Sequence, residues 1–326
     1  MKELEFLEII KNTLSKNTHI GDDCAFLTDL GIVLTQDTLV EDVHFSLNYS
    51  TPYQLGYKSI MVNLSDIFAS GAIAKYLSIS LSLPKNIDNS FVKDFYKACE
   101  DLSKKFDVEV IGGDITGSEK VFISICAIGL TKERNISSRS NAKVGDCIIV
   151  TGSHGSSAAG LWLLNNPNCH PVIVSESYPL SNLVKSHLET LVDQKFSTEI
   201  STKIKRDYAM MDTSDGLADA LFKIAKASDV QISVDFDKIP YDKAIEVVAD
   251  RAKIDFKDWI LYGGEDYKIV ACLDEENLKQ IKNADYTVIG RVKAKDENHF
   301  VEVVFGDKIE TISNLDKTFN HFKEQI

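Results

Sequence analysis

The sequence is poor in the features that mark disulfide-rich, zinc-binding or membrane-spanning proteins. Its six cysteines show no CxxC or CxH spacing, so neither a disulfide scaffold nor a zinc site is expected, and a reduced cytoplasm is the natural location. No apolar run reaches the roughly 18 residues that a membrane span needs. The first residues lack the apolar core of a signal peptide, and the six prolines form no proline-rich linker.

Positive charge is also scarce. The chain has 36 Lys and Arg against 49 Asp and Glu, a formal net charge of −13. This balance argues against a nucleic-acid partner, which needs a basic surface, and fits a protein that recruits cations. With 44% hydrophobic and 26% charged residues, the chain is expected to fold. Its 326 residues suit two domains of about 150 residues each.

Strand-like and helix-like patterns alternate along the first half of the chain. An amphipathic helix is predicted at the start, with Leu4, Leu7, Ile10 and Leu14 on one face. Four apolar runs predict strands, and two stretches with helical spacing lie between them. The strands are expected at 32–34, 77–83, 108–111 and 121–130, and the helices at about 56–70 and 90–106.

A basic, polar segment at 132–143 separates this half from the next and has the composition of an interdomain connection. The second half repeats the alternation, with strands predicted at 147–151, 208–211 and 231–234 and helices at 158–165 and 217–227. Residues 166–207 are the least interpretable, with helical tendency near 183–192. The pattern predicts a two-domain α/β (α+β) fold.

Aspartates recur where predicted strands end. Asp37 and Asp114 each follow an apolar run, and Asp212 and Asp215 follow another. Two more sites are the Gly21-Asp22-Asp23 turn and Asp66 inside a predicted helix. Each alone is compatible with ordinary capping and turn chemistry. As a set they favour a ligand site, because strand ends are where α/β folds bind ligands. Carboxylates sharing a cleft need cations, and oxygen-only ligands suit Mg²⁺ with a polyphosphate.

Other candidate phosphate contacts are weaker. The glycine-rich turn at 152–160 follows a predicted strand and opens a helix, so its backbone N–H groups could hold an anion, but it has no Walker A Lys. The Gly263-Gly264-Glu265-Asp266 turn is equally weak alone. Arg139 could reach a phosphate or be a solvated linker residue. His44 could be structural. No nucleophilic triad or activated thiol is indicated.

Eight motifs follow one another along the chain. They are GDDCA (21–25), QDTLVEDVHF (36–45), YKSIMVNLSDIFASGA (57–72), IGGDITGS (111–118), SRSNAKVGD (138–146), VTGSHGSSAAGL (150–161), MDTSDGL (211–217) and YGGEDYKI (262–269). In order and spacing they resemble the thiamine-monophosphate kinases, a family of the ATP-binding superfamily of aminoimidazole ribonucleotide synthase and selenophosphate synthetase. The resemblance covers nearly the whole chain except about 166–207.

The resemblance implies an N-terminal ATP- and Mg²⁺-binding dimerisation domain at 1–139 and a C-terminal α/β sandwich at 140–326 that completes the cleft. The N-terminal mixed sheets of two subunits would pair into a barrel, giving a homodimer. The implied reaction transfers the γ-phosphoryl group of ATP, with Mg²⁺, onto thiamine monophosphate to give thiamine diphosphate. The substrates are ATP and thiamine monophosphate, with no nucleic acid and no membrane as partner.

The resemblance also assigns residues. Asp66, Asp114, Arg139 and Asp215 are expected to be catalytic. ATP contacts fall on Gly113, Asp114, Arg139 and Ser214, and acceptor contacts on His44, Glu265 and Phe319. Phe319 replaces a usual tyrosine and would stack on a flat heteroaromatic ring of the acceptor. The metal set is Asp23, Gln36, Asp37, Asp66, Asp114, Asp212 and Asp215, and Gln36 stands where the family often has Ser or Thr.

This reaction explains why aspartates are many and a triad is missing. The acceptor phosphate is already ionised at neutral pH, so no strong general base is needed. The obstacle is repulsion between two anions, which metal ions and Arg139 would relieve while aligning the reactants. We expect direct in-line transfer without a phosphoenzyme.

Departures from the family keep alternatives open. The usual His-Leu-x-Pro-x-Pro-Arg stretch is represented only by 187–193, which lacks the prolines and the arginine, and Ser156 replaces an acidic residue. A catalytically weak or inactive nucleotide-binding homologue is one alternative, and the aminoimidazole ribonucleotide cycloligase is another. Selenophosphate synthetase would need a reactive Cys elsewhere than Cys24. The hydrogenase-maturation member would need a C-terminal Cys, whereas the last cysteine is Cys272.

Overall fold

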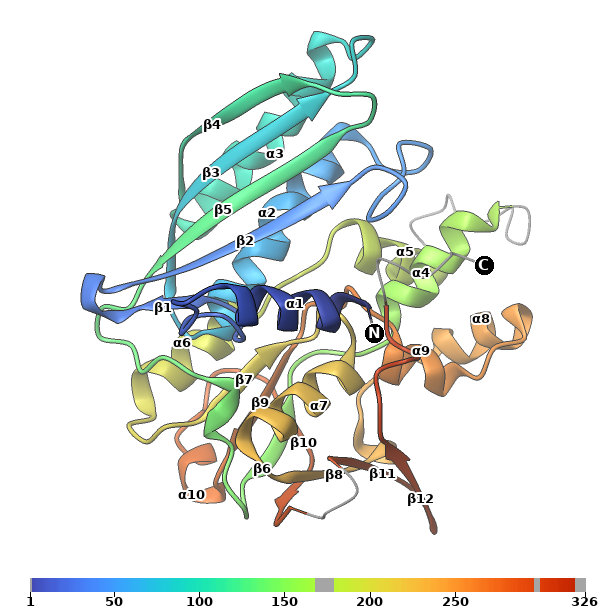
Figure 1. Cartoon of the computed structure of the whole chain (residues 1–326). Coiled ribbons are helices and arrows are strands. Elements are labelled where there is room, and N and C mark those ends of the chain that lie inside the picture. The colour runs from blue at the N-terminus through green and yellow to red at the C-terminus, as the bar shows by residue number, and fades with distance from the viewer. Residues whose placement is uncertain (1, 168–178, 296–299, 320–326) are drawn as a thin grey trace.

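The computed structural model describes residues 2–167, 179–295 and 300–319. Two mixed β-sheets, each packed against helices, make up this part of the chain (Figure 1). The predicted α/β (α+β) class is therefore confirmed. Cys169, one of the six cysteines, lies outside the described residues, and the other five have free thiols. Among the described residues, no helix is both long enough and apolar enough to cross a membrane.

The first sheet has the strand order β1-β2-β5-β3-β4. The pairs β1–β2, β2–β5 and β5–β3 are antiparallel, and β4 is parallel to β3. Each predicted strand is present, and most are longer than their apolar runs. The bounds are β1 Ala25–Leu27, β2 Ile32–Val40, β3 Ile73–Leu83, β4 Glu109–Gly117 and β5 Phe122–Leu130, with the short η1 at Thr28–Leu30.

Two helices, α2 (Pro52–Ala69) and α3 (Asn89–Phe106), cover one face of this sheet. α2 begins earlier than its predicted start, because Thr51 and Gln54 form a capping box and Pro52 follows the cap. α3 begins at the Asp88 cap. Their apolar residues and alternate strand residues form one core, which includes Ile60, Leu64, Ile67, Phe95, Leu102, Leu77, Ile79, Ile123 and Ile125. The helices thus fix which strand residues are buried.

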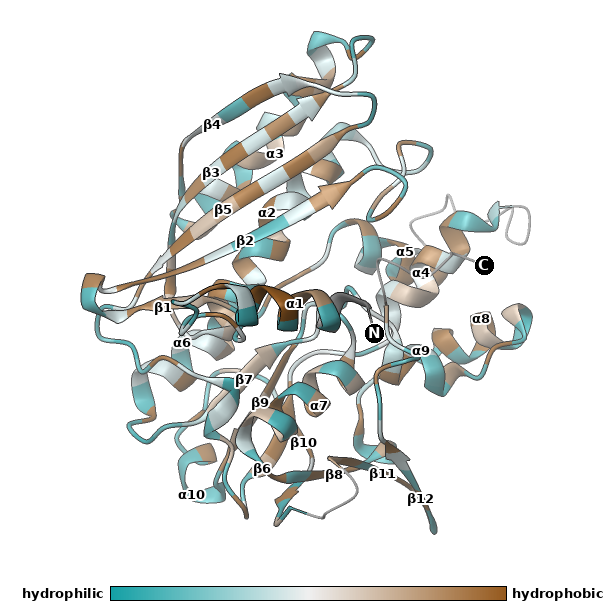
Figure 2. Cartoon of the chain, viewed as in Figure 1, coloured by the Kyte–Doolittle hydropathy of each residue, from teal (hydrophilic) through white to brown (hydrophobic). Residues whose placement is uncertain are grey.

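The edge strand β4 and the N-terminal helix α1 (Lys2–Thr13) leave apolar groups exposed. Ile111 and Ile115 of β4 are 53% and 66% exposed. In α1, Ile9 and Ile10 are also exposed, and Figure 2 shows this helix as one of the most hydrophobic segments at the surface. The predicted amphipathic helix exists, but its apolar face lies largely outside the cores of this chain.

The second sheet has the order β12-β11-β8-β10-β6-β9-β7. It is mainly antiparallel, with one parallel pair between β11 and β8. Alternate residues of β6 face opposite sides, which requires apolar cover on both. The bounds are β6 Cys147–Val150, β7 Ala209–Asp212, β8 Gln231–Asp235, β9 Ile269–Leu273, β10 Thr287–Lys293, β11 Val301–Phe305 and β12 Lys308–Ile312.

Helices cover both faces of this sheet, as the predicted sandwich requires. α7 (Leu217–Ser228) and α9 (Phe256–Tyr262) pack on one face. α6 (Gln194–Lys203) and α10 (Glu275–Leu278) pack on the other. α4 (Ser156–Asn165), α5 (Pro179–Leu188) and α8 (Ala244–Ala252) form a separate cluster, and the short η4 spans Phe236–Lys238. In the described part of 166–207, the least interpretable stretch of the sequence, α5 and α6 are present, and α5 overlaps the helical tendency expected near 183–192.

The connection between the sheets is ordered and anchored. It contains the short η2 (Arg139–Asn141). Ser137 donates its backbone N–H to Ser70 O at the end of α2, at 3.0 Å. The Ser228 hydroxyl at the end of α7 donates to Arg139 O at 2.7 Å. The segment that carries Arg139 is therefore held against elements of both sheets.

Candidate active site

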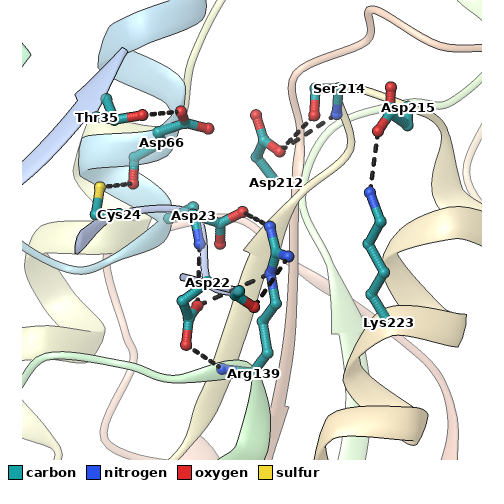
Figure 3. A network of polar contacts seen from close by, with 12 residues as sticks. Asp22, Asp23, Cys24, Thr35, Asp66, Arg139, Asp212, Ser214, Asp215 and Lys223 are labelled. Carbon is teal, nitrogen blue, oxygen red and sulfur yellow. Dashed lines mark hydrogen bonds and ion pairs between the residues drawn. The ribbon is translucent and has the colours of Figure 1, made fainter. Parts of the chain in front are cut away.

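Three of the predicted metal ligands meet between the two sheets. Asp23 precedes β1, Asp66 lies in the last turn of α2, and Asp212 ends β7 (Figure 3). One carboxylate oxygen from each lies within 4.8 Å of the others. The sites are separated by as many as 189 residues (212 − 23), so the packing of the two sheets, and not local sequence, creates this cluster.

Hydroxyl groups fix two of the carboxylates. Thr35 donates to Asp66 Oδ2 at 2.6 Å, and Ser65 donates to Asp212 Oδ2 at 2.6 Å. Ser214 donates to the other oxygen of Asp212 at 2.9 Å. Asp23 Oδ2 is buried and accepts no hydrogen bond from the described residues. A buried carboxylate oxygen that accepts no hydrogen bond destabilises the fold unless a cation binds to it.

The electrostatics of the cluster also indicate a site for a cation. Burial, opposed by Arg139 and reinforced by the charge of Asp212, raises the pKa of Asp23 to about 7. Burial and the neighbouring charge of Asp37 raise the pKa of Asp66 well above its ordinary value, and burial raises that of Asp212. Ionised together, these groups repel one another. The donor set is all oxygen, which fits a hard cation such as Mg²⁺ and not zinc.

Arg139 is the cation nearest to this cluster in Figure 3. Its guanidinium forms an ion pair with Asp23 Oδ1. Asp22 accepts from the Arg139 backbone N–H at 3.2 Å and from the Ser138 hydroxyl at 2.7 Å. The Arg139 side chain is only 15% exposed, so it is not a solvated linker residue. Burial opposes the charge, but Asp23 keeps the pKa of Arg139 above its ordinary value.

Asp215 lies beside the cluster at the N-terminal end of α7. It forms an ion pair with Lys223 at 3.0 Å, and the same ammonium contacts Asp219 at 2.6 Å. Asp219 is buried, and burial raises its pKa to about 6. Lys223 thus adds a second, half-buried cation to the acidic region, and the sequence patterns did not identify it.

A cavity of about 970 Å³ adjoins the carboxylates. Asp37, Ser214 and Asp215 line it together with all three predicted acceptor residues, His44, Glu265 and Phe319. Burial and the charges of Asp212 and Asp215 raise the pKa of Asp37 to about 7. The cavity thus runs from the acidic region to a part lined by aromatic and basic side chains, and the predicted acceptor residues are brought together.

Each carboxylate oxygen of Glu265 has a close polar neighbour. Lys58 Nζ lies 2.7 Å from Oε1, and His187 Nδ1 lies 3.3 Å from Oε2. Burial alone would raise the pKa of Glu265, but Lys58 and His187 bring it below its ordinary value. Burial and the Lys58 charge lower the pKa of His187 to about 4, so this imidazole is neutral at pH 7. Glu265 is therefore an ionised carboxylate in a mostly enclosed position.

His44 and Phe319 lie together at the same cavity. Their ring centroids are 6.3 Å apart with planes at 55°. His44 Nδ1 accepts the Val40 backbone N–H at 3.0 Å, which fixes the ring just after β2. Tyr49 contacts His187 edge to face, with centroids 6.2 Å apart. Aromatic side chains at this spacing can enclose a flat ligand ring.

Gly113 and Asp114 lie elsewhere, on the edge strand β4. Across the sheet, Thr38, Ser124, Ser80 and Asp114 form one row. Three strand spacings, about 14 Å, therefore separate Asp114 from β2. Asp114 is exposed on the face away from α2. A Cβ at Gly113 would stand 1.7 Å from Ile79 O, so this close strand pairing requires glycine. The Gln36 amide bonds Ser124 on the same exposed face, at 3.1 Å.

The glycine-rich turn before α4 does hold an anion, but the anion is part of the chain. Asp266 accepts from the backbone N–H groups of Gly155 at 2.5 Å and Ser157 at 2.9 Å. Asp266 is 5% exposed. The expected phosphate position at this helix end is therefore filled by a carboxylate from the Gly263-Gly264-Glu265-Asp266 turn. The contact joins the two weak glycine motifs to each other.

Sequence reasoning missed Lys58, His187 and Lys223 as members of the site. Lys58 is 4% exposed within a helix whose neighbouring residues are almost all buried. A lysine at an apolar position of an otherwise buried helix was the available signal, because such a lysine needs an anionic partner. His187 had no such signal, since its partners Glu265 and Ser157 are far away in the sequence.

Residues 21–131 match the family model "AIR synthase related protein, N-terminal domain", and residues 143–302 match "AIR synthase related protein, C-terminal domain". A thiamine-monophosphate kinase of Bacillus subtilis is 33% identical over 95% of this chain and 94% of its own length. The chain belongs to the thiamine-monophosphate kinase family. A second thiamine-monophosphate kinase, from Aquifex aeolicus, is 33% identical and covers 98% of both chains.

Solved structures of thiamine-monophosphate kinases agree with the fold. One described as "AaThiL complexed with AMPPCP and TMP" is 32% identical, with a TM-score of 0.81 over 93% of this chain and 94% of that chain. The structure of the hydrogenase maturation protein HypE in complex with ATP is 18% identical with a TM-score of 0.67, covering 88% of this chain and 86% of that chain. This second likeness concerns the fold alone. The predicted resemblance to thiamine-monophosphate kinases is confirmed.

Proposed function

We propose that this protein transfers the γ-phosphoryl group of ATP to thiamine monophosphate and forms thiamine diphosphate. The observation that carries the proposal is a cluster of carboxylates opening onto a cavity lined by His44, Glu265 and Phe319, in a chain of this family. The AaThiL structure, at 32% identity, holds AMPPCP and TMP. An acidic region for metal and polyphosphate beside an enclosed aromatic cavity is what such a reaction requires.

Divalent ions, most suitably Mg²⁺, would be held by Asp23, Asp66 and Asp212, with Asp37 and Asp215 at the side of the cavity. When bound, they supply positive charge between two anionic reactants. Arg139 adds a buried guanidinium next to Asp23 and suits phosphate oxygens. Ser214 is positioned by Asp212. We assign the nucleotide to Arg139 and Ser214, together with Gly113 and Asp114.

The acceptor is assigned to the part of the cavity around Glu265. An ionised carboxylate and the rings of His44 and Phe319 suit a flat, positively charged heteroaromatic group. The acceptor phosphate would then point toward Asp37 and Asp215, where the metals belong. No side chain has to remove a proton, because a phosphate monoester is largely ionised at neutral pH. Transfer is therefore direct, and Asp66, Asp114, Arg139 and Asp215 act by charge and alignment.

The homodimer belongs to this proposal. β4 is a nine-residue edge strand in which Val110 is half-buried and every other residue is exposed. Long exposed edges are normally protected by pairing with another strand. A second copy meeting this edge and the outer face of the first sheet would cover the exposed strand β4 and close the N-terminal sheets of the two subunits into a barrel. It would also carry Asp114 and Gln36 to the subunit boundary, since both lie on that outer face.

Two further assignments complete the proposal. Residues 1–139 form the ATP- and Mg²⁺-binding dimerisation domain, and residues 140–326 form the domain that completes the cleft. The boundary falls at the anchored segment around Arg139, between the two sheets. A cytoplasmic location is proposed from the free thiols of the five described cysteines, which fit a reducing compartment.

The test is an assay of the purified full chain with ATP, Mg²⁺ and a panel of thiamine, thiamine monophosphate and aminoimidazole precursors. Both ADP and the phosphorylated product are measured. Formation of ADP and thiamine diphosphate in equal amounts, with thiamine monophosphate alone, supports the proposal. Turnover only with an aminoimidazole precursor would identify a cycloligase. Binding of ATP and Mg²⁺ without ADP release for any acceptor would indicate a homologue that has lost turnover.

A further inference from the structure

Lys58 occupies an unusual position for a lysine. It lies on α2 together with Val62 and Asp66, which follow at intervals of four residues and so share one stripe of the helix. The stripe faces the cavity at Val62 and the carboxylate cluster at Asp66. Eight residues of helix rise about 12 Å. A single helix therefore places a metal-binding carboxylate at one end of the site and a buried ammonium at the other.

The ammonium of Lys58 joins two of the acceptor residues. It lies 2.7 Å from Glu265 Oε1 and donates to the backbone carbonyl of His44 at 2.9 Å. The Lys58 side chain is 6% exposed, whereas that of Glu265 is 23% exposed. Lys58 is thus more deeply buried than Glu265, and its ammonium bridges Glu265 and the segment that carries His44. It has little surface left for a ligand of its own.

His187 lies close to the other oxygen of the same carboxylate. Its Nδ1 lies 3.3 Å from Glu265 Oε2 and 3.0 Å from the Ser157 hydroxyl. His187 is 3% exposed. Glu265 itself has a left-handed backbone, with φ at 66°. The Lys58 ion pair and the His187 contact both favour the same orientation of the carboxylate, which directs its remaining lone pairs.

We propose that Lys58 and His187 are positioning residues that hold Glu265 toward the positively charged ring of the acceptor. The inference rests on the proposed function and deepens it. Without the ammonium, a buried carboxylate takes up a proton more readily and loses its attraction for a cation. Without either contact it can rotate away. Protonation and rotation of Glu265 both weaken acceptor binding. Neither alters the contacts that Arg139 and Asp212 make at the carboxylate cluster.

The experiment compares steady-state kinetics of Lys58→Met, His187→Asn, Glu265→Gln and the double variant Lys58→Met/Glu265→Gln in the full chain. Lys75→Met is the matched control, because Lys75 pairs with Asp107 at the surface of the first sheet. We expect Lys58→Met and Glu265→Gln each to raise KM for thiamine monophosphate about tenfold or more, as loss of a charged hydrogen bond does. KM for ATP should stay within about twofold, and His187→Asn should act in the same direction.

The double variant separates positioning from an independent effect. If Lys58 acts through Glu265, removing both costs no more than the worse single change, because coupled groups are not additive. The inference would be overturned if the rise in acceptor KM in the double variant equalled the product of the rises in the two single variants. An unchanged acceptor KM in both Lys58→Met and His187→Asn would also overturn it. If the wild-type chain binds thiamine monophosphate without turnover, the reaction is wrong, and the same comparison is made on dissociation constants. If it does not bind, both proposals fall.

Discussion

Asp66 illustrates how one side chain acquires its properties from the tertiary structure. In the sequence it is a polar residue within an apolar helix. In the fold it accepts from Thr35, lies near Asp23 and Asp212, and has a pKa well above its ordinary value because it is buried among like charges. A buried group of this kind destabilises the metal-free chain and is the mark of a site that binds a cation.

The first prediction concerns this residue. Asp66→Asn should lower kcat by at least about a hundredfold, because one charged contact to the reacting groups is lost. The metal-free variant should melt no lower than the wild type, since repulsion among the carboxylates is relieved. Rates and melting temperatures measure the two effects. Asp101→Asn is the control, as Asp101 pairs with Lys97 on the exposed side of α3. Near-normal turnover in Asp66→Asn would remove it from the metal site.

The second prediction concerns pH. The folded pKa values of Asp23 and Asp37, about 7, lie above the ordinary value of 3.8. Their ionisation therefore costs the metal-free fold stability as pH rises from about 4 to 7. Mg²⁺ binds only the ionised groups, so its affinity should rise with pH over the same range.

The measurement is the rise in melting temperature caused by Mg²⁺ at pH 6 and at pH 8, with a chelator as reference. The rise should be larger at pH 8. Asp66→Asn should show a smaller rise at both pH values. Equal effects of Mg²⁺ at the two pH values in the wild type would show that these carboxylates do not titrate with metal binding.

At the scale of elements, the start of α4 shows how a local pattern can have two different partners. A glycine turn leading into a helix offers free backbone N–H groups. The sequence suggested phosphate, and the fold supplies Asp266 from the turn that also carries Glu265. The contact fixes that turn against α4 and so helps to place Glu265 at the cavity.

The third prediction tests this contact. Asp266→Ala should lower the free energy of unfolding by about 2–4 kcal/mol, because two buried N–H groups lose their acceptor. Urea denaturation measures the loss. Asp255→Ala is a matched control: Asp255 caps α9 from an exposed position, accepting from Lys257 N at 3.0 Å, and its loss should cost about 1 kcal/mol. Equal losses would mean that the buried contact adds nothing beyond an ordinary cap.

At the scale of the whole molecule, the outer face of the first sheet is the feature that a single chain leaves incomplete. Asp114 lies there, three strands from β2, while Asp37 faces the helices and the carboxylate cluster. Within one subunit the two aspartates therefore lie apart. In the proposed dimer, we expect Asp114 to serve the nucleotide site of the other subunit.

The fourth prediction is active-site complementation. Co-expressed Asp114→Asn and Asp66→Asn chains, each inactive alone, should recover about a quarter of the wild-type activity, because half the dimers are mixed and each mixed dimer keeps one intact site. Asp66→Asn mixed with Asp212→Asn is the control, since both residues belong to the same subunit's site and no intact site forms. Mixtures of the first pair as inactive as the second would place Asp114 in its own subunit's site or outside it.

Local patterns in the sequence determined much of this protein. The apolar runs predicted the strands, and the order of the motifs indicated the family. Capping residues such as Asp88 set where helices begin. Only the tertiary structure decided that Asp23, Asp66 and Asp212 meet, that Asp266 fills the glycine turn, and that Lys58 and His187 hold Glu265. The reason is physical: secondary structure follows from neighbours along the chain, whereas these contacts join residues 43 to 207 positions apart and exist only once both sheets have packed.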